Sequence, residues 1–163
     1  MRWFRFALLI LAVTVIQKGF LARWSSKPDL LVILLVFYAI HYNTSVAIIS
    51  SFTIGFAADL VGSPMPMGPQ MISFGLFGTL LAYLHRVIAI KRMPYQAFAI
   101  FATSVMTGAL SHLLAYITGE PVAANIYAVI FITALYSSIV GPFLFLPLAW
   151  WMKMRTNRFG RHY

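Results

Sequence analysis

The side chains of this chain that could take part in acid–base or metal chemistry are few and scattered. Its 163 residues include three acids and four histidines, and no cysteine. These are Asp29, Asp59, Glu120, His41, His85, His112 and His162. Acid–base catalysis needs two titratable groups held close together, and a metal site needs ligands at short regular spacing. Neither pattern occurs, so the sequence predicts a protein that is not an enzyme and binds no cofactor or metal.

Asp59 is the acid with the most unusual surroundings. It closes an apolar stretch and precedes a turn that contains Pro64 and Gly68. A carboxylate within a membrane is unfavourable unless it is paired or hydrogen-bonded. Two roles are open: an ion pair with Lys18, expected at similar depth, or a cap of the turn through backbone amides. A proton relay is a third, disfavoured role, because no second carboxylate lies mid-span.

Small residues recur on one face of two consecutive apolar segments, 45–62 and 70–85. The first face holds Ser51, Gly55, Ala58, Asp59 and Gly62, and the second holds Gly75, Gly78, Thr79 and Ala82. Small residues let helix backbones approach closely in lipid. The pattern predicts a tightly packed helix pair, with a substrate or ion path as the alternative. We also expect that a groove lined by these residues could receive a partner's transmembrane helix.

His112 lies on a polar helical face with Ser104, Gly108 and Ser111. A histidine within a membrane can relay protons or bind a metal. Here we expect it to form a hydrogen bond between helices, because no other ligand has suitable spacing.

The composition identifies the class of protein. Hydrophobic residues make up 61% of the chain and charged residues 9%, whereas ordinary soluble domains carry about 25% charged residues. The net charge is +9, and the basic residues cluster at the ends of apolar segments. This arrangement indicates membrane topology and anionic lipid rather than nucleic acid. We therefore expect an integral membrane protein.

Six apolar segments are candidates for crossing a hydrocarbon core about 30 Å thick. They are 4–22, 29–41, 45–62, 70–85, 94–118 and 123–151. Residues 30–58 could instead form one helix, but it would be roughly 43 Å long and would bury the polar stretch 41–45. A hairpin is the better prediction. Gly141, Pro142 and Pro147 should kink or break the last helix.

The distribution of charge leaves the topology open. Six spans with both termini in the cytoplasm agree with the excess of basic residues inside, and so do five spans with an external N-terminus. Both arrangements place the loop 86–92 and the basic C-terminal tail in the cytoplasm. Because of the hairpin, we favour six spans, the first of them an uncleaved N-terminal segment. The predicted fold is an all-α integral membrane protein, a bundle of six transmembrane helices in one domain.

Two short motifs carry a resemblance to a known family. Lys27-Pro28-Asp29-Leu30-Leu31 opens the second segment, and the run from Gly55 through Asp59-Leu60 and Gly62-Ser63-Pro64 to Gly68 closes the third. With these motifs the chain resembles the MreD family of bacterial rod-shape-determining proteins. The resemblance implies a non-enzymatic scaffold of the cell-elongation complex in the cytoplasmic membrane. It also implies binding to MreC, with indirect links to MreB, RodZ, RodA and a penicillin-binding transpeptidase, and support of peptidoglycan synthesis.

The family's architecture is similar to that of the substrate-binding subunits of energy-coupling-factor transporters. A vitamin-type transporter subunit is therefore the alternative function, with Trp24, Tyr116, Asn125 and Tyr127 as residues that could line its pocket. An Ala-x-x-x-Ala docking pattern, frequent in those subunits, is missing because Ala7 and Ala12 are five residues apart.

The candidate residues form two groups, neither with a catalytic role. Asp59, Pro64 and Gly68 belong to the turn, with Lys18 as a possible partner. Gly55, Gly75 and Gly78 are the candidates for helix or partner contacts.

Overall fold

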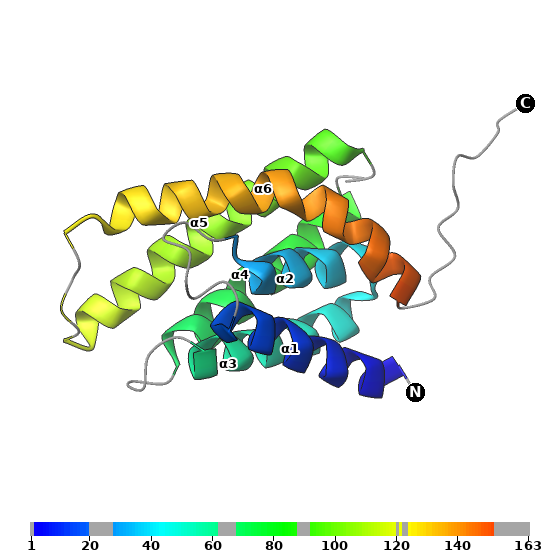
Figure 1. Cartoon of the computed structure of the whole chain (residues 1–163), viewed down its shortest axis with the longest axis horizontal. Coiled ribbons are helices and arrows are strands. Elements are labelled where there is room, and N and C mark those ends of the chain that lie inside the picture. The colour runs from blue at the N-terminus through cyan, green and yellow to red at the C-terminus, as the bar shows by residue number, and fades with distance from the viewer. Residues whose placement is uncertain are drawn as a thin grey trace, which may run out of the picture.

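The computed structural model describes residues 2–19, 28–61, 68–87, 92–119, 121 and 124–151. Within these ranges the chain forms six helices and no strand (Figure 1). The helices are α1 (Arg2–Gly19), α2 (Leu30–His41), α3 (Thr44–Val61), α4 (Pro69–Val87), α5 (Met93–Ile117) and α6 (Ile126–Trp151). The prediction of an all-α fold is confirmed.

The helices lie where the apolar segments predicted them, with ends that differ by at most three residues. The hairpin prediction is confirmed, because α2 ends at His41 and α3 begins at Thr44. The last helix continues through Pro142 and Pro147. Its C-terminal part turns away from the direction of its first half (Figure 1). The prolines therefore bend α6 without breaking it, as expected where a ring removes a backbone donor.

Helix α2 forms the centre of the bundle. Every residue from Leu31 to Ile40 is buried, and α2 contacts each of the other five helices. A helix that is hydrophobic on all sides is stable only when it is surrounded by protein or lipid. Its 12 residues extend roughly 18 Å, much less than a hydrocarbon core of about 30 Å. Because protein surrounds it, its length does not have to match the bilayer.

The outer helices form an incomplete ring around α2. Neighbours pack in the order α1, α3, α4, α5 and α6. Among the described residues, no Cα atoms of α1 and α6 lie within 8 Å of each other. The ring is therefore open between its first and last helices.

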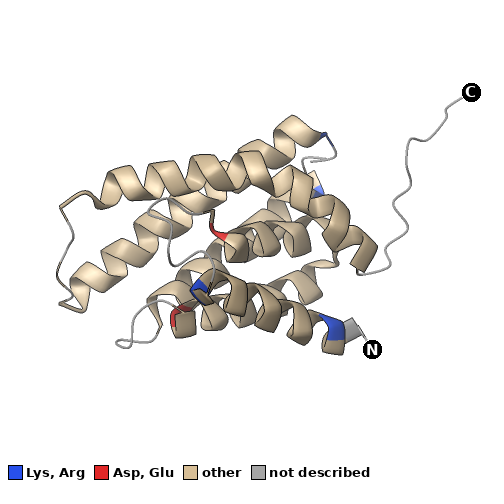
Figure 2. Cartoon of the chain, viewed as in Figure 1, with Lys and Arg blue, Asp and Glu red and all other residues tan. Residues whose placement is uncertain are grey.

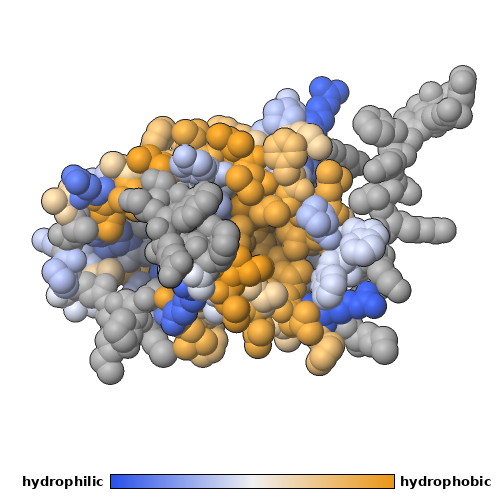
Figure 3. All heavy atoms as spheres, viewed as in Figure 1, coloured by the Kyte–Doolittle hydropathy of each residue, from blue (hydrophilic) through white to orange (hydrophobic). Residues whose placement is uncertain are grey.

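The outside of the bundle is apolar. Helices α3, α5 and α6 are long and apolar enough to cross a membrane, and α2 is a shorter apolar helix. Large hydrophobic side chains are exposed on all five outer helices, and hydrophobic residues fill the middle of the face in Figure 3. Water would disfavour such a surface, whereas lipid tails accommodate it. The chain is thus an all-α membrane protein.

The two ends of the bundle differ in charge. The beginning of α1, the end of α4 and the beginning of α5 carry Arg5, Arg86 and Arg92. Toward the other end lie Lys18 and the described acids, Asp29 and Asp59 (Figure 2). The helices run in alternating directions, so the α2–α3 turn lies at the arginine end.

Candidate functional site

Asp59 caps a helix from the end of the preceding one. Its carboxylate accepts hydrogen bonds from the backbone N–H groups of Gly68 (3.0 Å), Gln70 (3.0 Å) and Met71 (2.9 Å). These donors belong to the start of α4, where the first turn has no partners within the helix. A negative charge there is also favoured by the helix dipole. Asp59 is only 6% exposed, so it ties α3 to α4 inside the protein.

The residue before α4 explains why Asp59, from another helix, caps it. Gly68 precedes α4 directly and has no side chain with which to cap it. Its φ of 132° is strained for residues with a side chain. The candidate Pro64 lies outside the described residues. Of the two roles left open for Asp59, the geometry supports the turn cap.

The structure does not support an ion pair between Lys18 and Asp59. Lys18 lies in the last turn of α1 and is exposed. Within the part of the chain that the structure describes, no ion pair joins it to Asp59, whose oxygens instead accept three backbone hydrogen bonds. Matching depth along α1 and α3 was not sufficient to predict an ion pair. The N–H groups at the start of α4 already satisfy the Asp59 carboxylate.

The small-residue faces of α3 and α4 pack against each other. A Cβ atom on Gly55 would lie 2.7 Å from the Met71 Cα, and one on Gly75 would lie 2.5 Å from the Phe52 ring. One on Gly78 would collide with Ser51. The predicted tight helix pair is therefore present. The expected groove for a partner's helix at these glycines is wrong, since α3 and α4 fill it themselves.

Asp29 is a second carboxylate cap, and sequence analysis treated it only as part of a motif. Its Oδ1 accepts hydrogen bonds from the N–H groups of Leu31 and Val32 at the start of α2, and from Gln17 Nε2 of α1 at 3.2 Å. Its own N–H donates to Ser137 Oγ of α6 at 2.8 Å. One residue thus joins the central helix to α1 and α6. An acid directly before an apolar run was the available signal.

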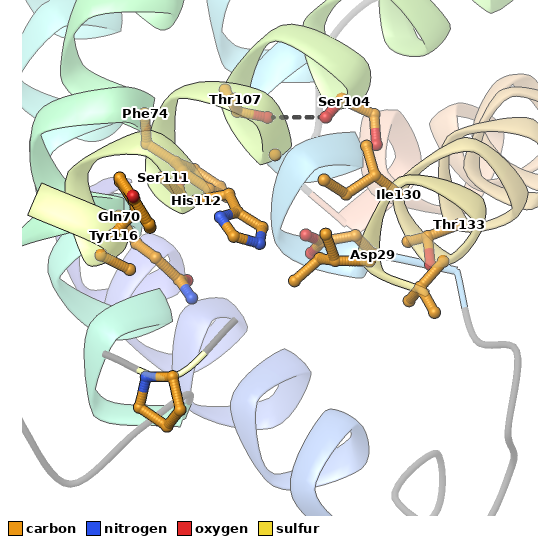
Figure 4. A pocket seen from close by; sticks show the side chains of 15 residues that line it. Asp29, Gln70, Phe74, Ser104, Thr107, Ser111, His112, Tyr116, Ile130 and Thr133 are labelled. Carbon is orange, nitrogen blue, oxygen red and sulfur yellow. Dashed lines mark hydrogen bonds between the residues drawn. The ribbon is translucent and has the colours of Figure 1, made fainter. Parts of the chain in front are cut away.

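A cavity lined by both polar and apolar side chains lies between the two caps. Its volume is about 320 Å³ and its lining comes mainly from α5 and α6. Asp29 lines one side and Gln70, whose N–H is bonded to Asp59, lines another. Figure 4 shows these residues with Thr107, whose hydroxyl donates to the Ser104 carbonyl. At roughly 30 Å³ per molecule, the cavity has room for about ten waters.

His112 extends from α5 into this cavity (Figure 4). Ser104, Gly108 and Ser111, which sequence analysis placed on its face, line the cavity too. The expected hydrogen bond between helices is not formed by Nε2, which is buried without a partner in the described part of the chain. The ring instead lies parallel to that of Tyr127 of α6, with 6.3 Å between centroids. A buried polar atom beside such a cavity is satisfied by a water molecule or another small polar group.

The residues suggested for a transporter pocket have different positions. Tyr116 lines the cavity, and the exposed Tyr127 lies beside it through its ring contact with His112. Asn125 is exposed, and Trp24 lies outside the described residues. No group of three metal-binding side chains occurs among the described residues. The arrangement of the described residues provides capping and helix packing.

Comparison with known proteins gives one match. A family model described as "rod shape-determining protein MreD" covers residues 1–155. Neither the curated proteins nor the solved structures that were compared provide a match. The matched range contains all six helices and both aspartate caps.

Proposed function

The chain belongs to the MreD family of rod shape-determining proteins, and from this membership we propose that it is a non-enzymatic scaffold that binds MreC. Its role in determining rod shape would then be to hold MreC in the membrane and so support peptidoglycan synthesis. MreB, RodZ, RodA and a penicillin-binding transpeptidase would be reached indirectly. The observation that carries the proposal is the match of the family model over residues 1–155.

The surface that we propose for MreC is a groove between α1 and α3, called here the α1–α3 groove. It has a volume of about 520 Å³ and is almost entirely apolar. Its lining consists of Trp3, Phe6, Ala7, Ile10, Leu11, Thr14, Val15, Thr53, Phe56, Ala57 and Leu60. Along α1 the lining runs from Trp3 to Val15, roughly 18 Å at 1.5 Å per residue. That is more than half of a hydrocarbon core about 30 Å thick, a length suited to a membrane helix.

Two features of this groove favour a helix as its occupant. Ala7 and Ala57 line it, and small residues allow helices to approach closely. Thr14 Oγ1 is buried without a hydrogen-bond partner among the described residues. Threonine hydroxyls form hydrogen bonds across helices in membranes, so a polar group on the MreC helix would satisfy it.

Cysteine cross-linking tests this assignment, because the chain has no native cysteine. Leu11 lines the α1–α3 groove, whereas Leu8 lines the opening between α1 and α6; both are exposed. Leu11→Cys should form disulfides with cysteines placed along the MreC transmembrane segment, at every third or fourth position. Leu8→Cys is the matched control. Cross-links formed by Leu8→Cys and not by Leu11→Cys would contradict the proposed surface.

We propose a location in the bacterial cytoplasmic membrane with both termini in the cytoplasm. The excess of arginine at one end of the bundle supports this orientation. It places the α2–α3 turn inside and the turn after α5 outside. Single cysteines at these turns can report it directly.

A further inference from the structure

A second groove follows the open side of the helix ring, between α1 and α6. We call it the α1–α6 groove. Its volume is about 400 Å³. Leu8, Ala12 and Ile16 line it from α1, Leu34 from α2, and Leu148 and Trp151 from α6. The face between these helices is hydrophobic and hollowed (Figure 3). No Cα atoms of α1 and α6 lie within 8 Å of each other in the described ranges, and the exposed side chains of Leu8, Ile16 and Trp150 place the groove on the lipid-facing surface.

The length of this groove suits an acyl chain. Along α1 the lining extends from Leu8 to Ile16, roughly 12 Å at 1.5 Å per residue. Along α6 it extends from Leu144 to Trp151, roughly 10 Å. One leaflet contributes about 15 Å to the hydrocarbon core. The groove therefore matches the length of an acyl chain in a single leaflet.

The arginine end of the groove fits a lipid headgroup. Arg5 is three residues before Leu8 and four before Leu9, so it lies one turn further along the same face of α1. Trp150 and Trp151 line the groove from the end of α6, and tryptophan prefers the headgroup level of the membrane. The beginning of α1 and the end of α6 lie at the same end of the bundle (Figure 1). An anionic phosphate above the groove would face the half-buried Arg5 guanidinium.

We propose that the α1–α6 groove binds one acyl chain of an anionic phospholipid, with the phosphate paired to Arg5. The lipid closes the ring around α2 by filling the space that α1 and α6 leave open. This site is separate from the surface proposed for MreC, so either assignment can fail without the other.

The test measures lipid binding by native mass spectrometry of the purified chain in mild detergent. Dioleoyl phosphatidylglycerol and dioleoyl phosphatidylcholine are titrated in parallel. The wild-type chain should retain one tightly bound lipid and prefer phosphatidylglycerol. Ala12→Phe places a ring in the groove and should raise the apparent Kd at least tenfold, since each excluded methylene contributes roughly a factor of four. Ala7→Phe, in the α1–α3 groove on the same helix, should leave the Kd unchanged.

The headgroup assignment has its own variant pair. Arg5→Gln should remove the preference for phosphatidylglycerol, whereas Arg86→Gln, at the same end of the bundle, should retain it. Ile16→Trp, also in the groove, replaces Ala12→Phe if that variant fails to give a monodisperse protein. Unchanged phosphatidylglycerol affinity in both groove-filling variants, Ala12→Phe and Ile16→Trp, would overturn the site. Loss of MreC capture in these variants, with their lipid binding intact, would also overturn it, because the groove would then hold MreC. A retained preference in Arg5→Gln would overturn the role of Arg5.

Discussion

Replacing Asp59 by alanine should destabilise the protein by disconnecting α3 from α4. The side chain accepts three backbone hydrogen bonds at 2.9–3.0 Å and is 6% exposed. Loss of a helix cap costs up to about 2 kcal/mol, and loss of the favourable charge at a helix N-terminus adds about 1 kcal/mol. The expected decrease in the free energy of unfolding is therefore about 3 kcal/mol. Asp59→Asn keeps one acceptor oxygen and should lose about half as much.

Unfolding of the purified protein in mixed micelles, followed by circular dichroism, measures these changes. Hydrogen exchange locates them, because the amides of Gln70 and Met71 should lose protection before those in the middle of α4. A double-mutant cycle with Lys18→Ala tests the rival ion pair. Lys18 is exposed, so the single change and the coupling energy should both be below about 0.5 kcal/mol. A coupling above about 1 kcal/mol, or an Asp59→Ala variant as stable as the wild type, would refute this reasoning.

The other predictions concern packing, the second cap and topology. Gly55→Ala should destabilise the protein by about 2 kcal/mol in the same unfolding assay, because the new Cβ meets the backbone of Met71. Gly19→Ala is the control, since it has open space around it and should not destabilise the protein. Equal effects of the two substitutions would contradict the close packing of α3 on α4. Asp29→Ala should cost about 2 kcal/mol by releasing the start of α2, with exchange increasing first at Leu31 and Val32; unchanged protection there would exclude the cap. In intact cells, a membrane-impermeant thiol reagent should label Thr118→Cys and not Ser45→Cys, and the reverse pattern would invert the proposed orientation.

The positions of the helices could be predicted because they depend on local sequence. Long apolar runs mark where a chain can cross a membrane, and the polar residues after Ile40 marked the turn between α2 and α3. The tight packing of α3 against α4 followed from their glycines, since small residues let helix backbones approach closely. The bend of α6 followed from its prolines.

What depends on the three-dimensional arrangement could not be predicted. The α2 sequence is hydrophobic on all sides, which is compatible with contact to lipid or to protein, so it did not by itself place α2 at the centre. The partner of Asp59 depended on the position of the start of α4 beside the end of α3, whereas matching depth suggested Lys18. The cavity beside His112 needs Gln70 and Thr133, which lie on other helices. Asp29 is different, because its position before an apolar run carried a capping signal.

The two grooves beside α1 are assigned to different ligands, the α1–α3 groove to MreC and the α1–α6 groove to a lipid. The α1–α3 groove is longer and holds an unpaired hydroxyl, while the α1–α6 groove is shorter and has an arginine beyond its end. Ala7 and Ala12 lie in different grooves on the same helix, so a matched pair of substitutions distinguishes protein binding from lipid binding.

The central claim is that the chain holds MreC in the membrane, and quantitative co-purification tests it most directly. Tagged wild-type chain is purified in mild detergent from native membranes, and the MreC recovered per molecule is measured by mass spectrometry. We expect MreC at a constant ratio with the wild type and with Ala12→Phe, and a loss of at least tenfold with Ala7→Phe, the change expected when about 1.4 kcal/mol of binding is removed. Absence of MreC from the wild-type sample, although it is present in the membranes, would contradict the proposed scaffold. Equal recovery with all three would contradict the groove.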